Sequence, residues 1–385
     1  MKNDPEIVAP DSMPVAELDK IVIPTGVPLN SICFPDKGRM HRRPVPLSGE
    51  ASSYHVMSRT VDGLTHFTDD EKEAFRMLVW RMAKFSGIEV LTYCVMGNHF
   101  HLLARVPPKE KFIQRFAGAE GEKRLFKHLR LLYSSAYVTR LRAEIDELRQ
   151  HGRERDVEMV LSRFTRRFCD LSLYVKELKE RYSRWYNKKH SRRGTLWMAR
   201  YKSVLVEPGG AMAMVAAYID LNPIRAGLVN DPGDYRWCGY AEALAGSKRL
   251  RRGLCRAIGW PIDHWESSNA GRMSGAEAYR EKLFEAGMDD ERRTQTRHKS
   301  RKRRGIALEK TRKVIEEGGK LTTGELLSHR VRWLSEGVAL GSEKFVGRAL
   351  GDPGKAGRLR ELPLNQTGDD EAWYCLSRWL RQGVG

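Results

Sequence analysis

Two histidines separated by a single residue are the first candidates for chemistry in this sequence. His99, Phe100 and His101 follow Met96-Gly97-Asn98, and the runs on both sides of that turn have the composition of paired strands. Residues i and i+2 of a strand share a face, so the two imidazoles project together while Phe100 points into a helix-packed core. Two such imidazoles can hold a divalent cation, although solvated or core histidines are a commoner reason for this spacing.

A tyrosine and an asparagine four residues apart form the second candidate pair. Tyr218 and Asn222 belong to a segment of small residues that predicts a helix from Ala211 to about Leu221. Residues i and i+4 lie on one helix face, so the two side chains are expected together. The ordinary explanations are a core tyrosine and, before Pro223, a helix terminator. As a nucleophile, a phenol with a pKa of about 10 needs activation.

Cations alternate with aromatic residues between residues 185 and 202. Unpaired bases stack on aromatic rings while cations follow the phosphates, which is how single-stranded nucleic acid is held. The alternative is that Tyr186 and Trp197 belong to the core and that the cations form a solvated face. The basic residues that we expect to contact nucleic acid are Lys188, Lys189, Arg192, Arg193, Arg200 and Lys202.

The elements that must position these residues follow an α+β pattern. Strands are expected at residues 54–59, 88–95, 99–106 and 195–207. A helix is expected from its N-cap Thr68 to Gly87, and a long charged helical stretch from about 109 to 188. The order of these elements predicts a ferredoxin-like antiparallel sheet with helices on one face, followed by a C-terminal helical extension.

Changes in composition divide the chain into four parts. The divisions are a Pro-rich N-terminal arm (1–50), an α+β domain (51–245), a basic linker region (246–305) and a small helical module (306–385). The helical patterns of the last part lie near 306–317, 323–335 and 342–350.

The 385 residues include 68 Lys and Arg against 49 Asp and Glu, a formal charge of +19. Such a surplus suits a polyanionic partner, most simply nucleic acid. Apolar residues make up 41% of the chain, which excludes a disordered protein, and no apolar run is long enough to predict a membrane span. The six scattered cysteines form no Cys-x-x-Cys pair, so reduced intracellular thiols are expected.

Four segments together resemble the IS200-like single-tyrosine transposases, most closely their REP-associated branch. The segments are YHVMSR (54–59), GNHFHLL (97–103), YNKKHSRRGTLWMARYKS (186–203) and AAYIDLNPIRAG (216–227), in the order of the family. The resemblance covers about residues 50–245. It implies that residues 51–245 are the catalytic domain, with a helical insertion at about 109–160. The segment at 327–347 looks similar to the C-terminal extension of longer members.

The resemblance implies a role for four residues. His99 and His101 match the family's metal ligands, Asn222 matches the polar residue that completes the metal site, and Tyr218 matches the nucleophile. It implies Mg²⁺ or Mn²⁺ as cofactor and cleavage and rejoining of single-stranded DNA beside a hairpin, through a 5′-phosphotyrosine. The implied location is the bacterial cytoplasm, at the nucleoid and away from membranes. A monomer and a homodimer both remain open.

Two other functions compete with a transposase. A catalytically inactive protein of the same fold would bind RNA or DNA without cleaving it. A zinc hydrolase would use the same two histidines, but the sequence offers no third histidine or carboxylate in a matching motif.

Overall fold

An antiparallel sheet of four strands forms the centre of the computed structural model. The structure describes residues 49–63, 67–118, 120–266, 273–287, 334, 337–350, 359–361 and 373–377. The four strands are β1 (Ser52–Arg59), β2 (Glu89–Val95), β3 (His99–Val106) and β4 (Lys202–Val206). They lie in the order β2-β3-β1-β4, each antiparallel to its neighbour. The predicted α+β class and antiparallel ferredoxin-like sheet are confirmed.

Strand register decides which side chains share a face of this sheet. In β1 and β3, Arg59 lies opposite His99 and Met57 lies opposite His101. On the other side of β1, Lys202 of β4 also lies opposite Met57. Residues directly opposite one another point to the same face, so these five side chains lie on one side of the sheet, which we call the histidine face.

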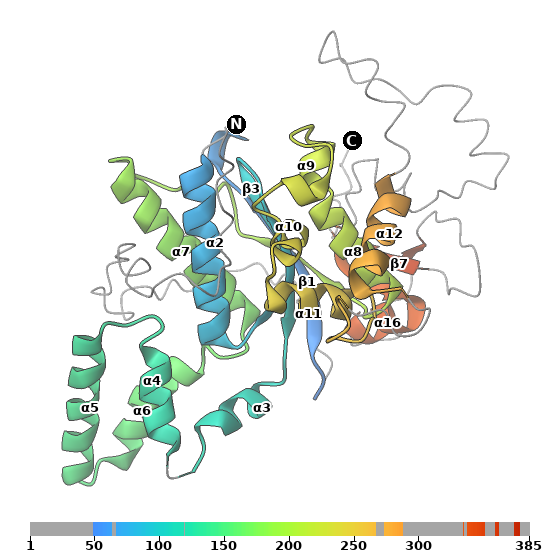
Figure 1. Cartoon of the computed structure of the whole chain (residues 1–385). Coiled ribbons are helices and arrows are strands. Elements are labelled where there is room, and N and C mark those ends of the chain that lie inside the picture. Colours follow the sequence, from blue (N-terminus) through green and yellow to red (C-terminus); the bar gives the residue numbers. More distant parts are fainter. Residues whose placement is uncertain are drawn as a thin grey trace, which may run out of the picture.

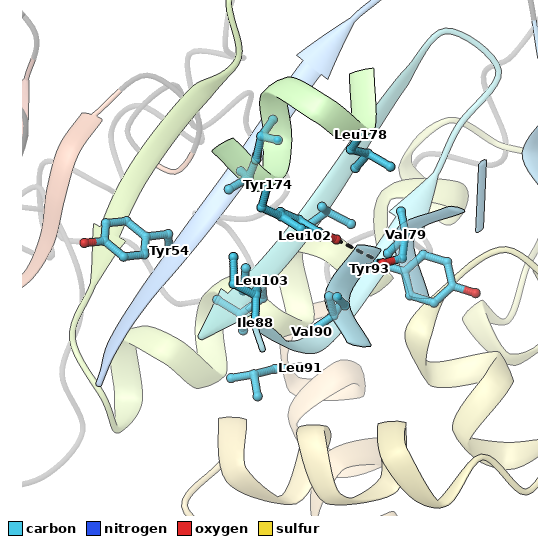
Figure 2. Packing of buried hydrophobic residues seen from close by; sticks show 14 of the residues in the cluster. Tyr54, Val79, Ile88, Val90, Leu91, Tyr93, Leu102, Leu103, Tyr174 and Leu178 are labelled. Atoms are coloured by element: carbon cyan, nitrogen blue, oxygen red, sulfur yellow. Dashed lines mark hydrogen bonds between the residues drawn. The ribbon is translucent and has the colours of Figure 1, made fainter. Parts of the chain in front are cut away.

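The opposite face is covered by α2 (Asp69–Ser86) and α7 (Leu171–Lys189). The rings of Phe75 and Phe100 lie 4.7 Å apart, which places α2 directly on β3. The Tyr174 hydroxyl of α7 donates to the backbone oxygen of Val79 in α2 at 3.3 Å, and Figure 2 shows this bond among the packed apolar side chains. As predicted, α2 starts after Thr68 and ends at Gly87, which adopts a left-handed conformation.

Helices also cover the histidine face, so the expectation of helices on one face only is corrected. Here α8 (Gly210–Asp220) and α11 (Lys248–Ala257) pack on β2, and α12 (Gly275–Gly287) packs on α8. The reason is that the strands are apolar on both sides and α8 is buried along most of its length. The buried Asp220 carboxylate anchors α8 by accepting from Thr92 at 2.9 Å and from Tyr279 at 2.6 Å.

The predicted helical insertion between β3 and α7 consists of several short helices. They are α3 (Lys109–Ile113), α4 (Gly121–Leu129), α5 (Ser135–Gln150) and α6 (Glu154–Thr165), with a 3-10 turn at Gln114–Phe116. Figure 1 shows α4, α5 and α6 grouped at lower left, away from the strands. The buried Arg167 guanidinium joins this group to α7, because it donates both to Tyr133 and to Glu177.

The C-terminal part extends the sheet, so the prediction of a purely helical module is wrong for the described residues. It contributes β5 (Gly337–Ser342), α16 (Glu343–Leu350), β6 (Leu359–Glu361) and β7 (Trp373–Ser377), giving the order β2-β3-β1-β4-β5-β7-β6. The free edge of β4 offers unpaired backbone groups, and β5 pairs with it in parallel. The helix predicted at 342–350 is confirmed; the pattern at 306–317, and that at 323–335 except for Leu334, lie outside the described residues.

The remaining elements connect these layers. They are α9 (Asn222–Arg225), α10 (Gly239–Leu244) and 3-10 turns at Val61–Gly63 and Pro232–Asp234. The range expected to be a basic linker, 246–305, contains α11 and α12, which pack on the folded domain instead of extending from it. The N-terminal arm up to residue 48 and the basic run at 292–304 lie outside the described residues. Within the described ranges, no helix is both long and apolar enough to cross a membrane.

Candidate active site

The hairpin of β2 and β3 brings the two predicted histidines beneath α8. The rings of His99 and His101 lie 5.1 Å apart, and the ring of Tyr218 lies 5.7 Å from that of His101. Tyr218 also contacts a third histidine, His55 of β1, at 5.8 Å. The structure thus assembles three of the four predicted site residues and adds one that the sequence analysis did not select.

Each predicted metal-binding histidine uses its Nδ1 atom within the protein. His101 Nδ1 lies 2.8 Å from His55 Nε2, and His99 Nδ1 lies 2.7 Å from Asn98 Oδ1. The Asn98 amide is held in turn, since its Nδ2 donates to the backbone oxygen of Gly63 at 2.8 Å. Both histidines therefore keep Nε2 as the nitrogen with which to bind a ligand.

Burial keeps these imidazoles uncharged near neutral pH. Loss of hydration lowers the pKa of His99 to about 4, and the nearby Arg59 adds to this effect. The pKa of His101 is also well below its usual range, first because of burial and then because of the neighbouring His55 and His99. A neutral imidazole is the form that coordinates a metal ion.

The helix α8 presents Tyr218 to this face because small residues let it lie close to the sheet. Tyr218 is only 8% exposed, and its neighbours Ala216 and Ala217 are buried. The guanidinium of Arg225, in α9, lies 4.9 Å from the centre of the Tyr218 ring. A cation in this position attracts negative charge that develops on or near the tyrosine oxygen.

Asn222 lies at the junction of α8 and α9. Its Nδ2 donates to the backbone oxygens of Tyr218 and Ile219, at 2.8 and 3.2 Å. Those bonds fix the amide group and leave Oδ1 as the atom that can accept a ligand. As predicted, the helix of Tyr218 ends before Asn222 and Pro223, and these two residues then begin the short helix α9.

By chemical type, the donor atoms of these residues suit a divalent cation. Two imidazole Nε2 atoms and one amide oxygen are neutral donors that leave positions for phosphate oxygens and water. Within the residues that the structure describes, no group of three or more His, Cys, Asp or Glu residues could hold a metal ion. His55 bonds to His101 and is not a third ligand, so the zinc hydrolase gains no support.

The six predicted DNA-contacting cations differ in their surroundings. Lys189 Nζ lies 2.5 Å from the buried Glu71 carboxylate, and Arg192 donates to Asn187 and to the Thr195 backbone oxygen. These two side chains are occupied within the fold. Lys202 lies half-buried on the histidine face. The remaining three, which are exposed, are Lys188, Arg193 and Arg200.

Two of the aromatic residues in this region belong to the core. Tyr186 and Trp197 are 6% and 8% exposed, and the Trp197 indole donates to the backbone oxygen of Lys179. They are therefore not stacking platforms for bases. Trp185 is half-buried at the end of α7, where Lys189 lies over its ring.

Four residues around the site were not among the site residues predicted from the sequence. His55 and Arg59 lie on β1, in the segment YHVMSR, at the even spacing that puts them on one face. Arg225 follows Tyr218 by seven residues, which is two helical turns. Asn98 was considered only as part of the turn. The spacing of His55 and Arg59 can be read from the sequence. The pairing of β1 with β3 shows that they share the face of His99 and His101.

One protein-family model matches the part of the chain that contains the hairpin of β2 and β3. The model described as "Transposase IS200 like" matches residues 49–133. Over these residues the chain matches the IS200-like transposase family. The matched segment contains β1, α2, β2 and β3, and so His55, His99 and His101; it ends before Tyr218 and Asn222.

Other comparisons add one structural likeness to the IS200-like match. No curated protein sequence matches the chain. One solved structure, of a REP-associated tyrosine transposase bound to a REP hairpin, is 12% identical, with a TM-score of 0.34. The likeness covers 61% of this chain and 96% of that one.

Proposed function

We propose that this chain is a transposase that cleaves and rejoins single-stranded DNA through Tyr218, with the help of a divalent metal ion. The observation that carries the proposal is the packing of the Tyr218 ring against His101, 5.7 Å away, beside two imidazoles whose Nε2 atoms make no hydrogen bond to the residues that the structure describes. The family match over residues 49–133 supports it independently. In this proposal, residues 51–245 form the catalytic domain.

His99, His101 and Asn222 would hold Mg²⁺ or Mn²⁺. Once bound, the ion would withdraw charge from the scissile phosphate and orient it for in-line attack. The Tyr218 oxygen then forms a bond to phosphorus while the bond to the 3′ oxygen breaks. The phenolic proton passes to solvent, and the departing 3′ oxygen takes up a proton. The products are a 5′-phosphotyrosine and a free 3′-OH, and the reverse reaction rejoins strands without ATP.

Cations on the histidine face support a phosphate-bearing substrate. Arg59 lies opposite His99, Lys202 lies on the neighbouring strand, and Arg225 lies over Tyr218. The exposed Lys188, Arg193 and Arg200 would follow the strand beyond the site. The proposed substrate is a DNA hairpin beside the cleavage site, and the proposed location is the bacterial nucleoid.

A covalent adduct tests this proposal directly. The full-length chain would be incubated with Mn²⁺ and single-stranded DNA hairpins labelled at either end, and the products separated on a denaturing gel. We expect a slow-migrating band with the fragment on the 3′ side of the cut, absent in Tyr218→Phe. Tyr137→Phe is the matched control, because Tyr137 lies on α5 in the helical insertion. An adduct that persists in Tyr218→Phe would show that the nucleophile is another residue.

A nucleic-acid-binding protein without chemistry is the second candidate. The burial of Tyr218 at 8% exposure is also what a core tyrosine would show. This candidate predicts a shifted band on a native gel and no covalent product with Mn²⁺ or Mg²⁺. The same labelled hairpins therefore separate the two functions.

A further inference from the structure

The buried His55 links the candidate metal site to the C-terminal part of the chain. It is 1% exposed, and its two ring nitrogens have different partners. Nε2 lies 2.8 Å from His101 Nδ1, and Nδ1 lies within hydrogen-bond distance of the backbone oxygen of Leu334. The proposed chemistry uses neither of these hydrogen bonds, although one of them ends on a predicted metal ligand.

The partners of His55 determine where the protons lie. A backbone carbonyl only accepts, so His55 Nδ1 must carry the hydrogen that it donates to Leu334. In the neutral ring, Nε2 then has a lone pair and accepts from His101 Nδ1–H. His101 is thereby left with its lone pair on Nε2. Burial lowers the pKa of His55 to about 4, in agreement with a neutral ring.

We infer that His55 is a positioning residue, which fixes the tautomer and the orientation of His101 so that Nε2 is the atom that would bind a metal ion. Metal-binding histidines are commonly held this way through their second nitrogen. The inference rests on the proposed function, because it assigns His55 a role toward the metal ion of that site.

The same geometry gives the C-terminal extension a part in the site. Leu334 is fully buried and precedes β5, which pairs with β4, and β4 in turn pairs with β1, the strand of His55. The two residues are separated by 279 positions in the sequence. His99 is held by its neighbour Asn98, whereas the support of His101 is complete only when the extension has folded on the sheet.

Metal binding by the full-length chain, without DNA, tests this role. Mn²⁺ would be titrated calorimetrically into wild type, His55→Leu and His55→Gln. We expect about tenfold weaker binding for His55→Leu, as is typical when the group that holds a ligand is lost. His55→Gln should restore most of the affinity, because a glutamine can donate at one end and accept at the other. The control is His128→Leu, which removes a histidine-to-carbonyl bond in the insertion.

The tautomer is measured separately, by ¹⁵N NMR of the histidine rings in wild type. The inference requires hydrogen on Nδ1 of both His55 and His101. It is overturned if His101 carries its hydrogen on Nε2, or if folded His55→Leu binds Mn²⁺ as tightly as wild type. If wild type binds no Mn²⁺, the proposed metal chemistry fails instead, while the tautomer still decides the arrangement of His55.

Discussion

At the scale of single residues, the candidate site is an arrangement of neutral ligands beside fixed positive charge. Burial keeps the imidazoles of His99 and His101 uncharged, and a neutral imidazole can coordinate a cation without repelling it. Arg225, whose guanidinium lies 4.9 Å from the centre of the Tyr218 ring, supplies charge on the other side of the tyrosine. Negative charge that develops during attack on a phosphate would be stabilised from both directions.

Arg225→Gln should therefore slow cleavage. We expect a single-turnover rate at least about tenfold lower, since removing one group that stabilises developing charge has effects of this size or larger. The rate would be measured with hairpin DNA at saturating Mn²⁺. Lys123→Gln, which removes a cation from α4 in the insertion, should leave the rate unchanged. An unchanged rate in Arg225→Gln would mean that this guanidinium serves packing only.

At the scale of elements, an ion pair between a buried carboxylate and a partly exposed lysine connects the start of α2 to the end of α7. Glu71 is 1% exposed and lies 2.5 Å from Lys189 Nζ and 3.0 Å from His190 Nε2. Burial acts to raise the pKa of Glu71, but the hydrogen bonds from Lys189 and His190 outweigh it, so its pKa is below the ordinary value. The contact holds the end of α7, where the basic residues begin, against the start of α2.

Glu71→Gln should destabilise the protein by about 1–2 kcal/mol at neutral pH, because a hydrogen-bonded charge is lost and Lys189 is partly exposed. A carboxylate whose folded-state pKa is lowered stabilises the fold above its unfolded pKa, and the effect disappears as the pH falls through the folded value. The difference between wild type and variant should thus shrink below a pH of about 4.5.

Urea unfolding at several pH values measures this difference. Glu180→Gln is the control, because its carboxylate lies 4.0 Å from Lys176 in a more exposed pair, and its effect should be small. A Glu71→Gln difference that stays constant from pH 7 to pH 3 would contradict the role of the charge.

At the scale of the whole molecule, the net charge is +19, and the described Lys and Arg side chains include some that are bonded within the fold and others that are exposed. Lys189 and Arg192 are among the bonded ones. The exposed Lys188, Arg193 and Arg200 belong to the end of α7 and the segment that follows it, before β4. These exposed cations should release counterions when they contact the phosphates of a DNA strand.

Replacing Lys188, Arg193 and Arg200 together by Gln should weaken binding of single-stranded DNA and reduce its salt dependence. The slope of log affinity against log salt should fall by about 2, at about 0.7 per phosphate contact. Fluorescence anisotropy between low and moderate salt measures this slope. The control replaces the exposed arginines Arg155, Arg163 and Arg166 of α6 and its end, with the same change in net charge. Equal losses in both variants would indicate a nonspecific effect of charge.

Features that depend on local spacing could be predicted from the sequence. The His-x-His pair on one face of β3, the hairpin at Gly97-Asn98 and the helix between Thr68 and Gly87 all follow from periodicity and turn chemistry, and the structure has them. The α+β class followed from the order of these elements. In each case the residues involved are close neighbours in the chain, so no distant contact was needed to predict them.

Contacts between residues far apart in the sequence became known only from the folded structure. It placed His55 behind His101, put Trp197 in the core and paired Lys189 with Glu71. It also showed that the C-terminal extension adds strands to the sheet and brings Leu334 to His55. These contacts join residues far apart in the chain. Their strength depends on burial and on strand pairing, and the local spacing of residues carries no information about either.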